Sequence, residues 1–287
     1  MRAIFILLFS FLLLGTELAA GQTGQIWIGP TDVSEIDGRI IIPPRWATLS
    51  DFEGPIVFCR GYYEQNRHEE GVWGWYVDYP GADNNLLVRL AELTKVRIRL
   101  DSDHKPVFVV VRLDSPLLFQ CPVLFLSDVG TIGLTENEVT NLRHYLEKGG
   151  FLWADDFWGS ESWKHWEHQI RLVLPENLYR MVDISAVHPI MNTLYNVFEI
   201  PQIPNIGFWY RTGGQTSERG EDSKEVHFRG IEGKKGRLIV VMTHNTDIAD
   251  TWEREAKVFD PTGQFFNTFS PIGYQIGINI FLYALTQ

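Results

Sequence analysis

Apolar residues fall along the chain either in short unbroken runs or at helical spacing. The runs predict strands, because a continuous apolar stretch is typical of a strand buried on both faces of a parallel sheet. After one short strand near 39–42, the predicted strands are 56–59, 96–100, 107–111, 123–126, 150–154, 181–184, 225–231 and 237–243. Helical spacing predicts helices over 84–94, 136–148, 160–173 and 271–285.

The helix over 136–148 has the clearest boundary signals. Thr135 is a helix-capping residue and Glu138 follows three positions later, which is the capping-box pattern. Gly149 comes directly after the last periodic residue, where helices commonly end. For the next helix, Ser160 is the expected cap.

The alternation of strands and helices predicts an α/β fold. We expect a doubly wound, mostly parallel sheet with helices on both faces, in three layers. The regular pattern begins at residue 55, so the predicted domain is 55–287, and residues 22–54 form an N-terminal extension rich in Gly, Pro and Asp. In such a sheet, ligands bind at the carboxyl ends of the strands.

Polar and aromatic residues follow the predicted strands at those ends. The residues that we expect to line a shared cleft are Arg60, Tyr62, Asp155, Asp156, His188, His244 and Asp247. Asp155 and Asp156 equally fit a structural role, capping the next helix or pairing with a cation. His188 precedes Pro189, which fixes a turn that would present the imidazole to the same rim.

His165 and His168 lie one helical turn apart, near Asp155 and Asp156 in the sequence. Imidazoles and carboxylates together are the composition of a divalent metal site. However, the segment 165–168 is one residue shorter than the His-x-x-Glu-His zinc signature, and a charged helix face exposed to solvent is the competing interpretation. No cofactor is predicted from the sequence.

The chain lacks the sequence motifs of several enzyme and nucleotide-binding classes. The chain has no Gly-x-Ser-x-Gly and no glycine two residues before either cysteine, so a nucleophile elbow is absent. Phosphate-binding glycine loops are absent as well. The net charge of −11 argues against nucleic acid as a partner, since phosphate binding needs clustered Lys and Arg.

A cluster of aromatic residues lies in an irregular, glycine-rich segment: Tyr62, Tyr63, Trp73, Trp75, Tyr76 and Tyr79. Aromatic rings beside carboxylates are typical of surfaces that bind sugars or peptides. The alternative is that these rings fill a small core beneath a long loop.

The N-terminus predicts export. Arg2, the apolar run 3–15 and the small residues at 19–21 form the three regions of a secretory signal peptide, so residues 1–21 are expected to be removed. The run is thirteen residues long, whereas a membrane anchor needs about 20. An uncleaved anchor is the alternative interpretation. No other stretch is long enough to span a bilayer, so a periplasmic or secreted location is predicted. Cys59 and Cys121 are the only cysteines and form either a disulfide or two buried thiols.

The order of several segments resembles the bacterial family known as domain of unknown function 4159, over about residues 55–286. The segments are 58–62, 84–94, 122–126, 142–156, 188–190, 244–247 and 277–280, of which the Gly-Gly-Phe-Leu-Trp-Ala-Asp-Asp stretch at 149–156 is the most specific. The resemblance implies a place in the class I glutamine amidotransferase-like superfamily and a flavodoxin-like sheet. The chain departs from that superfamily in lacking the cysteine elbow, and the family implies no reaction for Asp155, Asp156 or His188.

These observations predict an exported ligand-binding or interaction module of the cell envelope that is not an amidotransferase. Its expected partners are a carbohydrate or another envelope component. The alternative function is a hydrolase that acts on carbohydrate or envelope material with Asp155, Asp156 and His188. Shared chemistry requires these side chains to lie within hydrogen-bonding reach of one site.

Overall fold

A computed structural model of the protein describes residues 34–36, 39–69, 71–255 and 260–286. The predicted signal peptide, 1–21, and part of the predicted extension, 22–54, lie outside the described residues. The described part of that extension packs on the domain, because the backbone of residues 45–47 exchanges hydrogen bonds with Val110.

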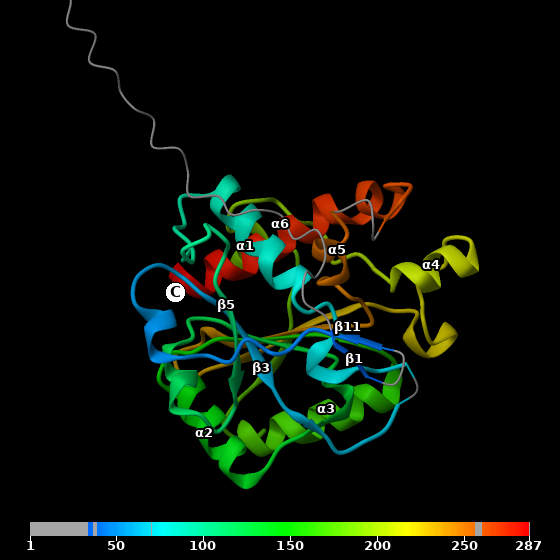
Figure 1. Ribbon diagram of the computed structural model, residues 1–287. Coiled ribbons are helices and arrows are strands. Elements are labelled where there is room, and N and C mark those ends of the chain that lie inside the picture. The colour runs from blue at the N-terminus through cyan, green and yellow to red at the C-terminus, as the bar shows by residue number, and fades with distance from the viewer. Residues whose placement is uncertain (1–33, 37–38, 70, 256–259, 287) are drawn as a thin grey trace, which may run out of the picture.

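The centre of the molecule is a seven-stranded sheet (Figure 1). Its strands, in spatial order, are β5 (Phe108–Arg112), β3 (Phe58–Tyr62), β6 (Leu124–Ser127), β8 (Leu152–Phe157), β11 (Leu238–His244), β10 (His227–Glu232) and β9 (Met181–Asp183). The first five are parallel, and β10 and β9 are antiparallel to their neighbours. Two small sheets pair β1 (Ser34–Ile36) with β2 (Arg39–Ile41) and β4 (Glu64–Gln65) with β7 (Ile132–Gly133). The predicted α/β class with a mostly parallel sheet is confirmed.

Helices pack against both faces of this sheet (Figure 1). On one face lie α1 (Gly81–Leu93), α5 (Asp250–Glu253) and α6 (Gln264–Thr286), over a core that includes Leu86, Trp153 and Phe281. On the other lie α2 (Glu136–Glu147) and α3 (Gly159–Val173), over a core that includes Leu142 and Trp166. A short helix, α4 (Ile206–Thr212), lies between β9 and β10 in the sequence. Single turns of 3-10 helix occur at Leu49–Phe52, Gly74–Tyr76, Pro116–Gln120, Val129–Thr131, Pro189–Asn192 and Gly220–Ser223.

The capping signals of α2 are confirmed, whereas those of α3 are wrong. The hydroxyl of Thr135 accepts from the Glu138 N–H, and the Glu138 carboxylate accepts from the Thr135 N–H at 2.9 Å. At α3, Ser160 does not cap the helix. Instead, the N–H of Ser160 donates to Asp222 and that of Gly159 donates to Asn245, at 2.9 and 2.8 Å. These caps come from distant segments, so a local pattern does not reveal them.

Several predicted elements differ in the structure, with strand ends such as those of β3 and β8 shifted by two or three residues. Residues 96–100 form no strand, because only the isolated bridges of Ile98 and Leu100 connect them to neighbours. Helix α1 begins at Gly81, three residues earlier than expected. Helix α6 begins at Gln264 and contains Pro271 within it, whereas the pattern placed Pro271 at the start.

Cys59 and Cys121 form a disulfide, with their Cα atoms 5.9 Å apart. The bond joins β3 to the residue that follows the 3-10 turn Pro116–Gln120. This result decides between the two alternatives that the sequence leaves open, and neither sulfur is free. Among the described residues, none of the helices combines the length and apolar character needed to cross a bilayer.

Candidate functional site

The end of β8 is irregular where the two predicted aspartates lie. The register against β11 pairs Met242 with Ala154 and then His244 with Phe157, so Asp155 and Asp156 together face the single residue Thr243. This arrangement is a β-bulge, which redirects side chains and is frequent beside functional sites. Asp156 has a φ of 55°. The bulge separates the directions of two neighbouring carboxylates.

Left-handed backbone conformations gather at the carboxyl end of the sheet. Asp128 follows β6, Asp156 lies at the end of β8, Asn245 follows β11 and Asp78 precedes α1, with φ between 55° and 63°. Among the described non-glycine residues, only His104 shares this conformation elsewhere. Asp and Asn tolerate it best, and clustered backbone strain is typical of functional sites.

Three of the carboxylates at this end meet. One oxygen each of Asp78, Asp156 and Asp247 lies within 4.8 Å of the other two, and we call this group the acidic centre. The three residues come from the loop before α1, the end of β8 and the loop after β11. They are 8%, 8% and 2% exposed.

Few hydrogen bonds reach the acidic centre. One oxygen of Asp156 accepts from the Trp158 indole N–H at 2.9 Å, and one oxygen of Asp247 accepts from the Asp250 N–H at 2.8 Å. The Oδ2 atom of Asp78 is buried and has no hydrogen-bond partner among the described residues. An unpartnered buried carboxylate oxygen is costly, which makes this atom a pointer to a ligand.

Burial is the main cause that raises the pKa of all three carboxyl groups well above the usual value. Neighbouring negative charge raises each pKa further. Asp128 and Asp78 act on Asp156, whereas Asp156 and Asp78 act on Asp247. The charges of Glu253 and Asp250 raise the pKa of Asp78, and those of Arg254 and Arg60 oppose them in part. The acidic centre therefore holds protons more tightly than isolated carboxylates do, unless a cation replaces them.

A second acidic group shares Asp78 but is neutralised by the chain itself. Oxygens of Asp78, Asp250 and Glu253 also lie within 4.8 Å of one another. The Arg254 guanidinium forms ion pairs with both Asp250 and Glu253. This group contains its own cation, whereas among the described residues no cationic side chain forms an ion pair with Asp78, Asp156 or Asp247.

Asp155, although adjacent to Asp156, has a structural environment. Its side chain is fully buried, and its two oxygens accept from the Thr243 hydroxyl and from the Ala249 N–H. These bonds fix β11 and the loop after it, which contains Asp247. Burial raises the Asp155 pKa to about 7.

Arg60 does not line an open cleft. It is fully buried in β3, and its guanidinium binds the Asp83 carboxylate and the carbonyls of Trp75 and Val77. Arg60 thus holds the loop that carries Asp78. Tyr62 lies nearby but is occupied by a hydrogen bond to Glu64.

His244 and His188 do not join the acidic centre. His244 stacks on Phe157 and Trp163, under α3, on the face of the sheet opposite to the Ala249 contact of Asp155. Burial lowers its pKa to about 4. The His188 ring packs at a tilt against Tyr283, whose hydroxyl contacts the N–H of Leu238 at the start of β11. It therefore lies at the amino end of the strands, far along the sheet from the predicted rim.

The predicted histidine pair at 165 and 168 likewise gathers no carboxylate. The His165 ring nitrogen bonds to the Ile132 carbonyl at 2.7 Å, and His168 is exposed. Neither residue belongs to a group of three potential metal ligands among the described residues.

The aromatic cluster mostly packs on itself. Trp75 contacts Tyr62, Tyr76 and Tyr79, with ring centroids 5.4 to 5.7 Å apart. Trp73 differs, since it is 43% exposed and its N–H, with that of Gly74, donates to Asp128. The rings therefore largely form a small core, with Trp73 at the surface.

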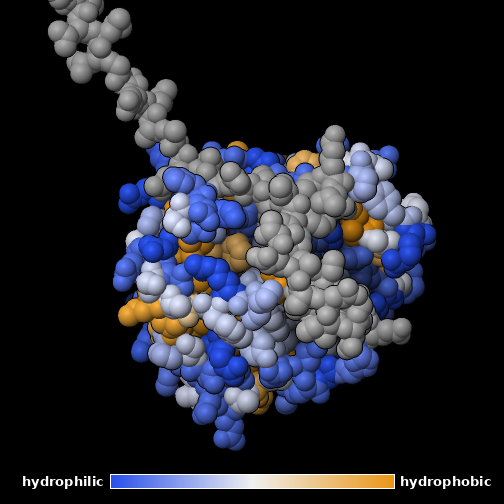
Figure 2. Space-filling view, viewed as in Figure 1, coloured by the Kyte–Doolittle hydropathy of each residue, from blue (hydrophilic) through white to orange (hydrophobic). Residues whose placement is uncertain are grey.

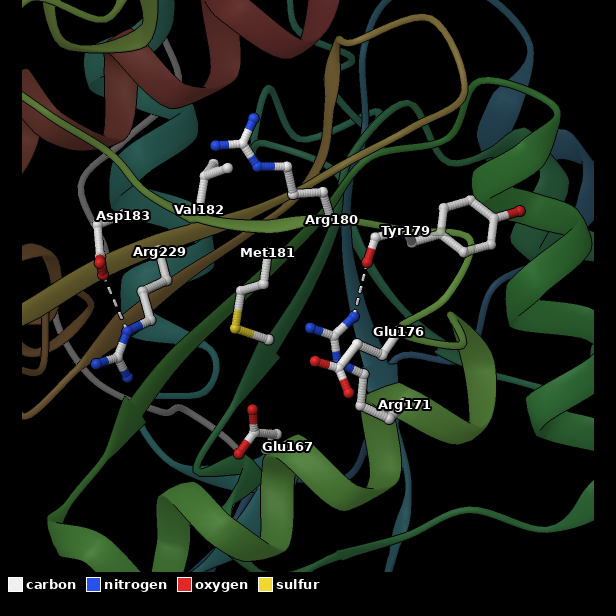
Figure 3. Close-up of a pocket in the computed structure, with 9 residues that line it drawn as sticks. All are labelled: Glu167, Arg171, Glu176, Tyr179, Arg180, Met181, Val182, Asp183 and Arg229. Atoms are coloured by element: carbon white, nitrogen blue, oxygen red, sulfur yellow. Dashed lines mark hydrogen bonds and ion pairs between the residues drawn. The ribbon is translucent and has the colours of Figure 1, made fainter.

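Two cavities lie away from these residues. One, of about 410 Å³, lies between α3 and the edge strand β9 and includes Arg171, Arg180 and Arg229 (Figure 3). All three arginines have partners, since Arg171 donates to the Tyr179 carbonyl, Arg229 pairs with Asp183 and Arg180 pairs with Glu232 at 4.0 Å. The other, of about 480 Å³, lies at the amino end of the sheet. Figure 2 shows a largely hydrophilic face with small separate apolar patches.

Two residues of the acidic centre, Asp156 and Asp247, are predicted from the sequence as cleft residues at strand ends. The third, Asp78, is not predicted. Asp78 lies in the irregular segment between β4 and α1, where no periodic pattern marks a strand end. In the sequence, Asp78 is marked only as an acidic residue directly before Tyr79-Pro80 in an aromatic-rich segment.

Comparison with known proteins identifies a family but no curated relative. No curated protein matches the chain. The family model described as Domain of unknown function (DUF4159) matches residues 67–285, which contain β8, β11 and all three residues of the acidic centre. The chain therefore belongs to the DUF4159 family.

Proposed function

We propose that the protein is an exported ligand-binding module of the cell envelope, without amidotransferase activity, whose ligand binds at the acidic centre. The observation that carries the proposal is the convergence of Asp78, Asp156 and Asp247 at the carboxyl ends of parallel strands. This is where α/β sheets of this kind bind their ligands.

Two features support export to the periplasm or beyond. The first is the signal-peptide pattern over residues 1–21. The second is the disulfide between Cys59 and Cys121, since disulfides persist mainly in oxidising compartments.

The sheet order supports a flavodoxin-like, amidotransferase-like architecture. The parallel strands β3, β5, β6, β8 and β11, counted along the chain, have the spatial order 2-1-3-4-5, which is the flavodoxin-like order. The absence of amidotransferase chemistry follows from the cysteines. Both are held in the disulfide, so neither provides the thiolate that attacks an amide.

A carbohydrate or another polar envelope component is the proposed ligand class. The acidic centre supplies carboxylates, and the exposed Trp73 ring lies in the loop that leads to Asp78. Such a ring stacks on the apolar face of a sugar while polar groups fix the hydroxyls. The hydrolase alternative requires Asp156 and His188 to act at one site. His188 lies at the opposite end of the strands from Asp156, which does not support this arrangement.

The test is co-sedimentation of residues 22–287 with purified peptidoglycan, together with a glycan array. We expect binding that Asp156→Asn and Trp73→Ala each weaken. Asp183→Asn, an exposed aspartate on β9, is the matched control and should bind like the unaltered protein. Lack of binding to both materials would contradict the proposal, and release of soluble sugars that depends on Asp156 would support the hydrolase instead.

A further inference from the structure

We propose that Asp78, Asp156 and Asp247 bind a Ca²⁺ ion, which presents open coordination positions to the envelope ligand. The cation site itself stands on the geometry of the acidic centre. Its second part, contact between the ion and the ligand, rests on the proposed function.

The carboxylate oxygens lie close enough together for one cation to contact all three. Ca²⁺ binds oxygen at about 2.4 Å, so two oxygens on opposite sides of it are at most about 4.8 Å apart. The three oxygens of the acidic centre all lie within 4.8 Å of one another. Mg²⁺ demands near-ideal octahedral geometry and usually keeps several waters, so a buried set of protein carboxylates favours the more flexibly coordinated Ca²⁺.

The charge balance points to a cation as the missing partner. Asp78, Asp156 and Asp247 carry three formal negative charges with no ion pair among the described residues. The neighbouring group around Asp250 and Glu253 provides an internal comparison, because there Arg254 supplies the positive charge. Where the chain provides a cation, the carboxylates are paired with it. Asp78, which belongs to both groups, is also close enough to Arg254 and Arg60 for their charge to act on it, but no described cation forms an ion pair with Asp156 or Asp247.

The buried Oδ2 atom of Asp78 is an independent indication of a ligand. Asp78 is 8% exposed, and this oxygen has no hydrogen-bond donor within reach in the described structure. By contrast, Asp156 and Asp247 each anchor one oxygen through Trp158 and Asp250, which orients the side chain. Hydrogen bonds of this kind commonly fix the direction of metal-binding carboxylates.

The donor set selects a hard cation. All three side chains offer oxygen, and the nearest predicted histidine, His244, packs under α3 with its Nε2 on the Gly159 carbonyl. Oxygen donors favour Ca²⁺ or Mg²⁺ over Zn²⁺, which prefers nitrogen and sulfur. Ca²⁺ takes six to eight oxygens, so three carboxylates leave positions that water or ligand hydroxyl groups fill.

The test uses the chain from residue 22, freed of metal with EDTA and dialysed. Calorimetric titrations with CaCl2, MgCl2 and ZnCl2, each alone, measure affinity, and thermal unfolding gives a second readout. We expect Ca²⁺ to bind with a dissociation constant of about 10⁻⁴–10⁻³ M, as in extracellular modules, and to raise Tm. Asp156→Asn should weaken binding by more than about 10-fold, because even changes around the ligands cost about 10–100-fold.

The variants separate a cation site from a structural role. Asn at position 156 keeps an oxygen for the Trp158 indole and removes a charge, so without metal Asp156→Asn should unfold at the same Tm as the unaltered chain or higher. Asp183→Asn alters an exposed aspartate on β9 that pairs with Arg229, away from the acidic centre, and should leave Ca²⁺ affinity within about 2-fold. Absence of Ca²⁺ binding, or equal binding by Asp156→Asn, would overturn the proposal, as would tighter binding of Zn²⁺.

Co-sedimentation with peptidoglycan, repeated with EDTA and with CaCl2, distinguishes this proposal from the proposed function. Binding that requires Ca²⁺ supports both. Binding that is equal in EDTA retains the ligand-binding function but overturns the contact between ion and ligand. Calorimetric Ca²⁺ binding without any binding of peptidoglycan or glycans retains the cation site and contradicts the proposed function.

Discussion

Replacing Arg60 with lysine removes the support of the Asp78 loop while it preserves the charge. The guanidinium donates through Nε to both oxygens of Asp83, at 3.1 and 3.0 Å. Through Nη1 it reaches the carbonyls of Trp75 and Val77, at 3.0 and 2.9 Å. Arg60 and Asp83 are both fully buried, so water does not replace a lost donor.

The expected cost follows from the bonds that lysine cannot make. A single ammonium group retains contact with Asp83 but does not span the fork to both carbonyls. Each buried carbonyl left without a donor costs about 1–3 kcal/mol. With two such groups and partial compensation by the ammonium, we expect Arg60→Lys to lower the free energy of unfolding by about 3 kcal/mol. Since the loop also carries Asp78, Ca²⁺ affinity should fall as well.

Urea unfolding followed by tryptophan fluorescence measures this change, with the metal removed. The control is Arg112→Lys on the neighbouring strand β5, because Arg112 forms an exposed pair with Asp114. We expect the control to change the free energy by less than about 0.5 kcal/mol. A loss below about 1 kcal/mol for Arg60→Lys would refute the reasoning that the forked geometry, rather than the charge, holds the loop.

Four further predictions concern pH, the disulfide, a helix cap and the excluded histidine. Because folding raises the pKa of Asp78, Asp156 and Asp247, their protonated forms stabilise the metal-free fold below the ordinary pKa of about 4, and this stability is lost as pH rises through the raised pKa values. Metal-free Tm should therefore fall as the pH rises above about 4, less steeply in Asp156→Asn, and a steeper fall in that variant would contradict the assignment. The Cys59–Cys121 disulfide spans 62 positions, so Cys121→Ser should cost about 4 kcal/mol in urea unfolding by the chain-entropy relation, and an unchanged unfolding midpoint would contradict it. Thr135→Ala removes the capping box of α2 and should lower the free energy of unfolding by about 1 kcal/mol. Urea unfolding of the variant and the unaltered chain measures the difference, and equal free energies would contradict the prediction. His188→Ala should leave Ca²⁺ titrations unchanged, and a weakened affinity would place His188 at the site after all.

Much of the fold was predictable because its signals are local. The capping box at Thr135 and Glu138 involves residues three positions apart, and the apolar runs of β6, β8 and β11 match strands buried on both faces. The cap of α3 was not predictable, since Asp222 and Asn245 reach it from segments more than sixty positions away. Residues 96–100 alternate like a strand, but only isolated bridges hold them.

The site was harder to predict for a related reason. Asp156 and Asp247 follow from the rule that strand ends carry function, whereas Asp78 lies in a loop whose course depends on the buried Arg60. The bulge at Asp155 and Asp156 decides which of the two carboxylates faces the centre, and a bulge leaves no mark in the alternation of the sequence. Strand β11 is buried on both faces, so its pattern does not show that His244 faces α3.

The most direct test of the acidic centre is a crystal structure of the chain grown with CaCl2. We predict a density peak at about 2.3–2.6 Å from one oxygen each of Asp78, Asp156 and Asp247, with further oxygens completing the shell. A structure without such a peak, in which the Oδ2 atom of Asp78 accepts a hydrogen bond from a neighbouring donor, would contradict the account.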